Sequence, residues 1–258
     1  SEVVDLIDGV ETLVLGSYWG LNVEARKGQP YGALFGDPLL REDLDGDGVG
    51  DPEGRIVVSA TSGLPLADPG NRRVLGNYNP DWNAGLLNRF SYGPVDFSIL
   101  FDMQQGGDVF SVTNMFGDYA GVLTTSLEGR ETGPCDPGLV VPNSVYVDGS
   151  GNYVENTRTV CPENYFHQLY FNDEAHIYDA SYVKLREAKI GFQVPSTWVS
   201  RIGFSSANIA VVGRNLALWA DIPHIDPETA FSAGNVQGIE FGQFPTARSI
   251  GFTVTVRP

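Results

Sequence analysis

Five segments of this chain alternate between apolar and polar residues, and this alternation constrains the fold more than any other feature. In the clearest of them, Ile250, Phe252, Val254 and Val256 alternate with serine, glycine and threonine. The five segments span 82–92, 95–104, 178–194, 207–220 and 249–256. A period of two predicts β-strands that each have one apolar and one polar face. The connections between them are alternately short and long, which favours an antiparallel arrangement.

This asymmetry of the connections distinguishes two all-β folds. Transmembrane β-barrels have tight periplasmic turns and long external loops. If the last strand ends in the periplasm, the long connections 105–177 and 221–244 both lie outside, and both short connections lie in the periplasm. Polar residues such as Asp102 and Gln104, opposite an apolar face, fit a wet lumen. We therefore expect an all-β fold, specifically an antiparallel transmembrane β-barrel with long extracellular loops.

The division of the chain follows from the same pattern. We expect residues 1–81 to be mostly extracellular loop segments, and residues 82–258 to hold about five barrel strands and long loops. The apolar face changes phase within 178–194, and a β-bulge would explain this change. A second change of phase occurs at 213–215 within the next strand, and a short helix is predicted near 109–119.

Charge and hydropathy exclude several classes of protein. The chain has 16 basic and 32 acidic residues, for a net charge of −16. Nucleic-acid binding requires a basic surface, and docking on an anionic membrane surface requires basic clusters, so both are excluded. No window approaches 18 consecutive apolar residues, so we expect no transmembrane helix.

Short motifs in a fixed order connect the chain to a known family. They are GQPYGALFGD, DLDGDGVGD, GNYNPDW at 76–82, ASYVKLR at 180–186, GRNL at 213–216 and FPTARSIGFTVTV near the end. In this order and spacing they resemble the C-terminal part of the SusC/RagA-type TonB-dependent outer-membrane transporters. The resemblance implies a 22-stranded barrel of which this chain supplies the C-terminal strands, with the plug and the TonB-contacting segment absent. The ending Val256-Arg257-Pro258 departs from the aromatic residue on which family members tend to end.

The resemblance also implies a function and a location. It implies TonB-dependent, energy-coupled import of a nutrient (a glycan, an oligopeptide or similar) across the bacterial outer membrane. The implied partners are a SusD-like surface lipoprotein, the TonB complex and outer-membrane lipid, with no nucleic acid. We expect no enzymatic activity, because no nucleophile–base pair, phosphate-binding loop or paired-carboxylate motif is visible.

Two alternatives to transport remain open on the sequence. One is a surface β-protein that binds a partner or a carbohydrate through its acidic loops, without transport. The other is a soluble β-sandwich hydrolase or carbohydrate-binding module. The sandwich predicts that the apolar faces of the strands share one protein core, whereas a barrel predicts that they face lipid.

An acidic loop is the candidate metal site. Asp43, Asp45, Asp47 and Asp51 alternate with other residues, and glycine occupies the sixth position of the loop. This pattern resembles the first half of a calcium-binding EF-hand loop. The twelfth position is Gly54 rather than the bidentate glutamate, and Asp-Gly runs also form ordinary turns. If Ca²⁺ binds, we expect it to order the loop.

The cysteines and histidines give weaker signals. Cys135 and Cys161 match no zinc-binding spacing, and we expect a disulfide between them in an oxidising compartment, with two free thiols as the alternative. His167, His176 and His224 are scattered, so we expect no metal site from them.

Four further residues are candidates for contact with a substrate or partner. Asp226 and Glu228 belong to an Asp-Pro-Glu motif in the predicted external loop, where a rigid turn is the alternative. Trp19 and Tyr78 are aromatic candidates for the mouth of the barrel. Packing in an interfacial aromatic ring is the commoner use of such residues.

Overall fold

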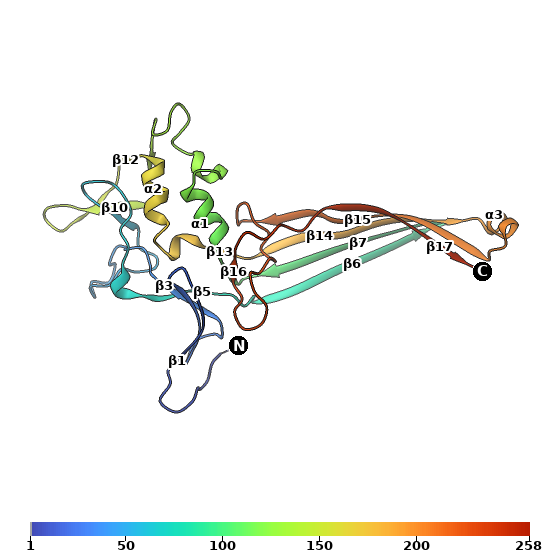
Figure 1. Ribbon diagram of the computed structural model, residues 1–258, viewed down its shortest axis with the longest axis horizontal. Coiled ribbons are helices and arrows are strands. Elements are labelled where there is room, and N and C mark those ends of the chain that lie inside the picture. The colour runs from blue at the N-terminus through green and yellow to red at the C-terminus, as the bar shows by residue number, and fades with distance from the viewer. Residues whose placement is uncertain (1) are drawn as a thin grey trace.

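A long sheet and a compact body make up the chain, as the computed structural model shows for residues 2–258 (Figure 1). The sheet extends to the right in Figure 1 and ends at α3 and the C-terminus. The body, at the left, carries the N-terminal sheet and the two longer helices. No helix within the described range is both long enough and apolar enough to cross a membrane.

The long sheet has five antiparallel strands in the order β17-β15-β14-β7-β6. Their bounds are β6 Trp82–Tyr92, β7 Val95–Gln105, β14 Tyr182–Val194, β15 Ser206–Ala220 and β17 Ser249–Arg257. These are the five segments that alternate in the sequence. One difference concerns the third strand, because Ile177–Asp179 forms a separate strand, β13, that pairs with β8 in another sheet.

The predicted β-bulge in β14 is confirmed. The pairing of β14 with both neighbours shifts between Leu185 and Glu187, so Arg186 has no partner in either register. Opposite this shift, Asn215 of β15 has a φ of 50°, a left-handed conformation that asparagine adopts more readily than most residues. The bulge restores the apolar residues on either side of it to the same face of the sheet.

The connections differ at the two ends of the sheet. The β6–β7 turn and the β14–β15 connection lie at one end, and the connection after β7 and the one before β17 lie at the other (Figure 1). The β14–β15 connection contains the one-turn helices α3 (Ser196–Val199) and η4 (Ser200–Ile202). The body therefore occupies only the end of the sheet with the long connections.

The body contains several small sheets. Residues 12–77 supply a four-stranded sheet in the order β1-β2-β3-β5, which is more regular structure than the sequence predicts for residues 1–81. Its strands are β1 Thr12–Tyr18, β2 Leu21–Arg26, β3 Ala33–Gly36 and β5 Arg73–Asn77. The remaining strands are β4 Ile56–Val58, β8 Asp108–Ser111, β9 Leu139–Val140, β10 Ser144–Val147, β11 Tyr153–Glu155, β12 Thr159–Val160 and β16 Ile239–Glu240.

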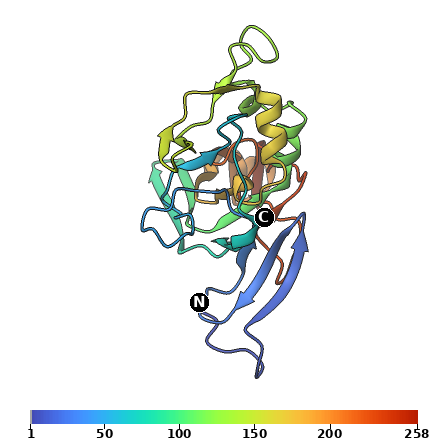
Figure 2. The same cartoon turned by 90° about the vertical axis from the view of Figure 1, so that its left-hand side faces the viewer.

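Two short helices cover the body (Figure 2). Helix α1 (Val112–Tyr119) lies within the stretch predicted as helical, and its N-cap Ser111 accepts a hydrogen bond from the backbone N–H of Asn114. Helix α2 (Pro162–Leu169) begins with proline, which is favoured at the first position because its missing N–H needs no partner there. The short 3₁₀ turns are η1 Pro69–Asn71, η2 Thr124–Leu127 and η3 Glu174–His176.

The main hydrophobic core lies in the body, where it joins segments that are distant in sequence. Leu21 and Leu34 of the N-terminal sheet pack with Phe110 of β8, Met115 of α1 and Ile239 of β16. All five are at most 3% exposed. Residues 221–248 connect β15 to β17, and through Ile239 they also contribute to the core of the body.

Candidate functional site

One face of the long sheet is apolar from edge to edge. A single cross-strand row contains Phe90, Phe97, Ile190, Val211 and Phe252, one from each strand. The same register places the following residues on this face: Trp82, Ala84, Leu86, Tyr92, Val95, Ile99, Phe101, Met103, Val183, Leu185, Ala188, Phe192, Ala207, Ile209, Ala217, Trp219, Ile250, Val254 and Val256. Asn88 is a polar exception, as the sequence predicts, and Gln105, paired with Trp82 at the end nearest the body, is a second.

This apolar face is not covered by other parts of the chain. The side chains of Phe252, Phe90 and Ile190 are 80%, 60% and 54% exposed. Soluble monomers rarely expose contiguous apolar patches of more than a few hundred Å². The β-sandwich alternative requires a second layer over these residues, and residues 2–258 supply none. The face therefore needs an apolar environment that lies outside the described chain.

The opposite face of the sheet is polar and charged. Asp96 accepts a hydrogen bond from the Asn208 side chain at 3.1 Å. Farther along the sheet, Arg214 pairs with Glu187 at 3.0 Å. Charged side chains on one face and none on the other are the arrangement expected of a wall between water and lipid.

A buried ionic network lies where this polar face meets the body. The Lys184 ammonium and the Asp226 carboxylate are 2.6 Å apart, and their side chains are 2% and 1% exposed. Glu228 contacts both Lys184 and Arg186, and it also accepts a hydrogen bond from the Tyr182 hydroxyl at 3.0 Å. Thr246 donates to the second oxygen of Asp226 at 2.5 Å. The network therefore attaches both ends of residues 221–248 to strand β14.

Electrostatics within the network favour ionised carboxylates. Burial by itself raises the pKa of Asp226, but hydrogen bonds from Lys184 and Thr246 outweigh it and hold that pKa below its ordinary value. The pKa of Glu228 is lowered in the same way, with burial opposed by Arg186 and Lys184. Since Asp226 is almost fully buried and satisfied by the protein, the geometry favours the rigid turn over contact with a substrate.

The other two candidates for contact lie elsewhere. Trp19 occupies the two-residue turn between β1 and β2, with φ of 50° for Trp19 and 103° for Gly20. Its ring centroid lies 4.9 Å from that of Phe241 and 6.0 Å from that of Phe116. Tyr78 packs against the main core instead. The structure thus brings Asp226 and Glu228 together, and Tyr78 also lines a pocket with Glu228, whereas Trp19 lies in a different part of the body.

The acidic loop folds so that three of its four carboxylates converge. Ligand oxygens of Asp43, Asp45 and Asp51 all lie within 4.8 Å of one another, whereas Asp47 does not belong to this group. The Asp43 carboxylate accepts backbone hydrogen bonds from Gly46 and Gly48. The bond from Gly48 is the largest cause of its lowered pKa. Three carboxylates at this spacing could supply oxygen ligands to a hard cation such as Ca²⁺.

A disulfide joins Cys135 and Cys161, whose Cα atoms are 4.5 Å apart. It connects the loop before β9 to the N-cap of α2. The bridge therefore closes a 26-residue separation within the body.

His176 is a buried neutral histidine rather than a metal ligand. Its Nε2 lies 2.9 Å from the carbonyl oxygen of Leu169, and its ring packs edge-on against Phe110. Its Nδ1 has no hydrogen-bond partner within the described residues. Burial disfavours the charged imidazolium and lowers the pKa of His176 to about 4, although the Leu169 carbonyl partly opposes this shift.

We expect acid to destabilise the wild type more than a His176→Leu variant. The side chain has a pKa of 6.5 when unperturbed and about 4 when folded. Between these values the unfolded state binds more protons, so stability falls as the pH falls through this window, by roughly 3 kcal/mol in all. Denaturant titrations at pH 7 and pH 4 measure the loss in each protein.

Asp173 makes the opposite contribution to the pH dependence of stability, and the comparison with the His176→Leu variant cancels it. Burial raises the pKa of Asp173 to about 6, so this carboxyl favours the folded state as the pH falls toward 4. Because both proteins keep Asp173, the difference between them isolates the histidine. Equal losses in the two proteins would show that His176 does not govern acid sensitivity.

The chain is similar in sequence to proteins of known name. No family model matches the chain. The chain is 28% identical over 269 residues to TonB-dependent receptor P26 of Formosa agariphila, covering 98% of this chain and 25% of that receptor. TonB-dependent receptor P3 of the same organism is 24% identical over 241 residues, covering 91% of this chain and 21% of the receptor. The chain is similar to TonB-dependent receptors.

Solved structures show the same fold. The RagAB peptide transporter superimposes with a TM-score of 0.62 at 13% identity, covering 99% of this chain and 25% of that chain. The RagAB peptide importer in its open-open state gives a TM-score of 0.59 at 13% identity, covering 98% and 25%. The resemblance to TonB-dependent transporters that the motifs indicate is therefore confirmed. None of these relatives is named as an enzyme, in agreement with the sequence.

The chain spans between a fifth and a quarter of the length of the receptors it matches. Its most extensive polar site is the ionic network, in which the sequence predicts Asp226 and Glu228 but not Lys184, Arg186, Tyr182 or Thr246. Lys184 and Arg186 belong to the ASYVKLR motif, but nothing in that motif identifies them as ion-pair partners of the Asp-Pro-Glu turn. The available signal was two cations close together in a strand, at positions where burial requires carboxylate partners.

Proposed function

We propose that this chain forms part of the barrel wall and the outer loops of a TonB-dependent transporter in the bacterial outer membrane. The observation that carries the proposal is the apolar face that crosses all five strands of the long sheet. The 11 residues of β6 at roughly 3.4 Å each extend about 37 Å. A tilt of about 45° reduces this to a height of about 26 Å, which matches the apolar band of about 25 Å in membrane barrels.

The edges of the sheet support the same proposal. Strands β6 and β17 each pair on one side only, within the part of the chain that the structure describes. In lipid, unpaired backbone groups at a sheet edge cost several kcal/mol each, so spanning sheets close into barrels. We therefore propose that further strands, 22 in total by resemblance, complete the barrel, and that the body lies on the extracellular side.

The transported substrate belongs to the proposal as well. The RagAB structures are described as a peptide importer, and the two receptors of Formosa agariphila carry no substrate in their names. We propose a nutrient of the oligopeptide or glycan class. A SusD-like lipoprotein would cap the outer end, and TonB would supply the energy for import.

Uptake by cells tests this proposal directly. Deleting the full-length gene should abolish uptake of the nutrient, and so should collapse of the proton-motive force in cells that keep the gene. Labelled oligopeptides and glycans, scored for arrival in the periplasm, are the measurement. Capture on the cell surface that persists without energy, with no entry, would favour the surface-binding alternative.

We also propose that the acidic loop binds Ca²⁺ through Asp43, Asp45 and Asp51, because their oxygens converge. Calorimetric titration with CaCl₂ should show one site, with dissociation in the range of about 10⁻⁴–10⁻³ M that is typical of extracellular modules. Asp45→Asn should weaken binding. Asp68→Asn, at an acidic residue outside the loop, is the matched control. If the Asp45→Asn variant binds Ca²⁺ with the same heat and affinity as the wild type, the proposed site is wrong.

A further inference from the structure

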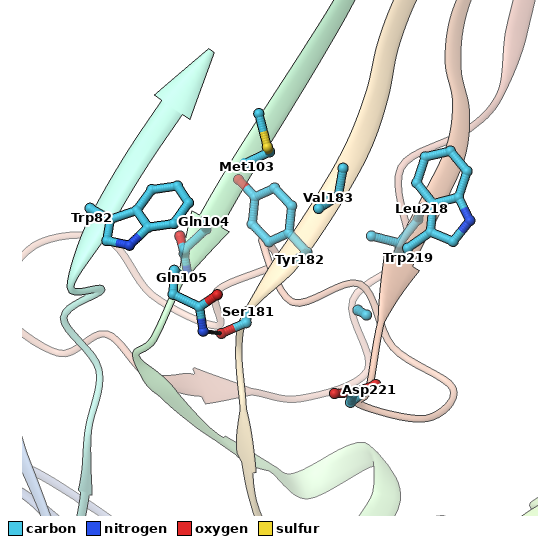
Figure 3. Close-up of a pocket in the computed structure, with 11 residues that line it drawn as sticks. Trp82, Met103, Gln104, Gln105, Ser181, Tyr182, Val183, Leu218, Trp219 and Asp221 are labelled. Atoms are coloured by element: carbon cyan, nitrogen blue, oxygen red, sulfur yellow. Dashed lines mark hydrogen bonds between the residues drawn. The ribbon is translucent and has the colours of Figure 1, made fainter. Parts of the chain in front are cut away.

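A pocket of about 430 Å³ lies in the body, between the C-terminal end of α1, the loop that follows it and helix α2. All the residues that line it fall within 118–167, so one continuous segment of the chain forms every wall. The groove in Figure 3 differs in this respect, because Trp82 of the edge strand β6 forms one of its sides. The disulfide holds the segment together, since its two cysteines lie next to Pro134 and close to Glu163, which both line the pocket.

Specific contacts fix the walls of this pocket. The rings of Tyr119 and His167 stack with their centroids 4.2 Å apart, and His167 Nε2 lies 3.2 Å from the carbonyl oxygen of Tyr119. These contacts join α2 to the end of α1 (Figure 2). The guanidinium of Arg130 lies over Gly121, where a Cβ atom would come within 2.9 Å of Nη1. Since Gly121 also has a φ of 68°, only glycine leaves this place to Arg130.

Three charged side chains line the pocket without pairing with one another. Arg130, Asp118 and Glu163 form no ion pair with any residue in the range 2–258. Asp118 is only 8% exposed; one of its carboxylate oxygens accepts a hydrogen bond from Thr125, and the other accepts none from a described residue. The one hydrogen bond of the Arg130 side chain within that range goes to the carbonyl oxygen of Ser126, at 3.4 Å. The pocket therefore offers donors and acceptors that the protein itself does not use.

Unpaired groups of both signs restrict the class of ligand. A guanidinium only donates hydrogen bonds and a carboxylate only accepts them, whereas a hydroxyl group does both. An anion or a cation would be attracted by one of these side chains and repelled by another. A ligand with several uncharged hydroxyl groups satisfies all three at once. Tyr119 and Phe166 add aromatic surface, whose negative π faces suit the C–H groups of a sugar ring.

We propose that this pocket binds one uncharged hexopyranose residue of a glycan. Arg130 would donate to one hydroxyl group, Asp118 and Glu163 would accept from others, and the sugar ring would pack on Phe166. The excess of acidic residues in the chain agrees with an uncharged ligand rather than an acidic glycan. The inference rests on the proposed function only for the location of the pocket outside the cell, and it selects the glycan class over the oligopeptide class.

Saturation-transfer NMR titrations of the full-length protein, in a detergent without a sugar headgroup, test the inference. The probes are the α- and β-methyl glycosides of glucose, galactose and mannose, with methyl glucuronide as the anionic comparison and trialanine as the zwitterionic one. At least one neutral glycoside should bind, and it should bind more tightly than either comparison. Arg130→Met should weaken that binding at least about tenfold, because it removes a charge-assisted hydrogen bond. Glu163→Gln should weaken it less, since the amide oxygen still accepts a hydrogen bond.

Arg158→Met is the matched control, because Arg158 is another arginine of the body that contacts the Tyr146 ring outside the pocket and forms no ion pair within residues 2–258. It should leave the affinity unchanged. The inference is overturned if no neutral glycoside binds, if methyl glucuronide or trialanine binds more tightly, or if Arg158→Met weakens binding as much as Arg130→Met. Binding is measured without transport, so its failure leaves the proposed function unaffected, whereas intact binding without uptake by cells would overturn only the proposed function.

Discussion

Replacing Leu86 with arginine should destabilise the sheet in a bilayer by about 2–4 kcal/mol, whereas the same replacement of its neighbour Leu87 should have little effect. Both leucines lie in the middle of β6 and both are 49% exposed. Leu86 pairs with Phe101 on the apolar face, and Leu87 pairs with Leu100 on the opposite face. Arginine on the lipid face of a membrane barrel near the bilayer midplane costs about 2–4 kcal/mol, whereas we propose that the opposite face of this sheet contacts water.

The measurement is folding of the full-length protein into phospholipid vesicles, followed by denaturant titration of each variant. The two variants match in residue type, charge change and exposure, and they differ only in the face of the sheet. Equal destabilisation by both would contradict the assignment of the faces. A larger loss of stability for the Leu87 variant would mean that the face with the charged residues is the one that contacts lipid.

Replacing Asp226 with asparagine should release residues 221–248 from the long sheet. The substitution leaves the Lys184 ammonium buried with only Glu228 as its anionic partner. Removing one member of a buried ion pair costs about 3–5 kcal/mol, and the remaining contact with Glu228 places the expected loss near the lower end. Limited proteolysis measures the release of residues 221–248. Denaturant titration measures the loss of stability of the whole protein.

An exposed ion pair on the same sheet serves as the control. The side chains of Arg214 and Glu187 are 66% and 34% exposed, and such pairs contribute about 0–1 kcal/mol. Glu187→Gln should therefore leave both proteolysis and stability near the wild type. If Asp226→Asn and Glu187→Gln have the same effect on proteolysis and stability, the ionic network does not attach residues 221–248 to β14.

The strands of the long sheet could be predicted because each carries its own signal. Alternation within one strand, such as Ile250 to Val256, reports its two faces without reference to any partner. Even the bulge between Leu185 and Glu187 appears in the sequence as a change of phase. Local patterns of this kind persist whatever the rest of the chain does.

The body and the site could not be predicted to the same degree, because their contacts depend on segments far apart in sequence. Nothing near Lys184 indicates that its partner is Asp226, 42 positions later. The strands of residues 12–77 are short and partly buried on both faces, so they lack the alternation that reveals a strand exposed on one side. Trp19 and Tyr78 were selected for their aromatic chemistry, which does not determine where a ring packs.

The composition of the main core has a consequence for the order of folding. Leu21 and Ile239 meet in that core although more than two hundred positions separate them, and closing so long a loop carries an entropic cost that must precede any gain from contact. Pairing of the five strands shortens the effective loop between Leu21 and Ile239, because it connects β6 to β17 through hydrogen-bonded neighbours. We therefore expect the body to become compact after the long sheet has formed.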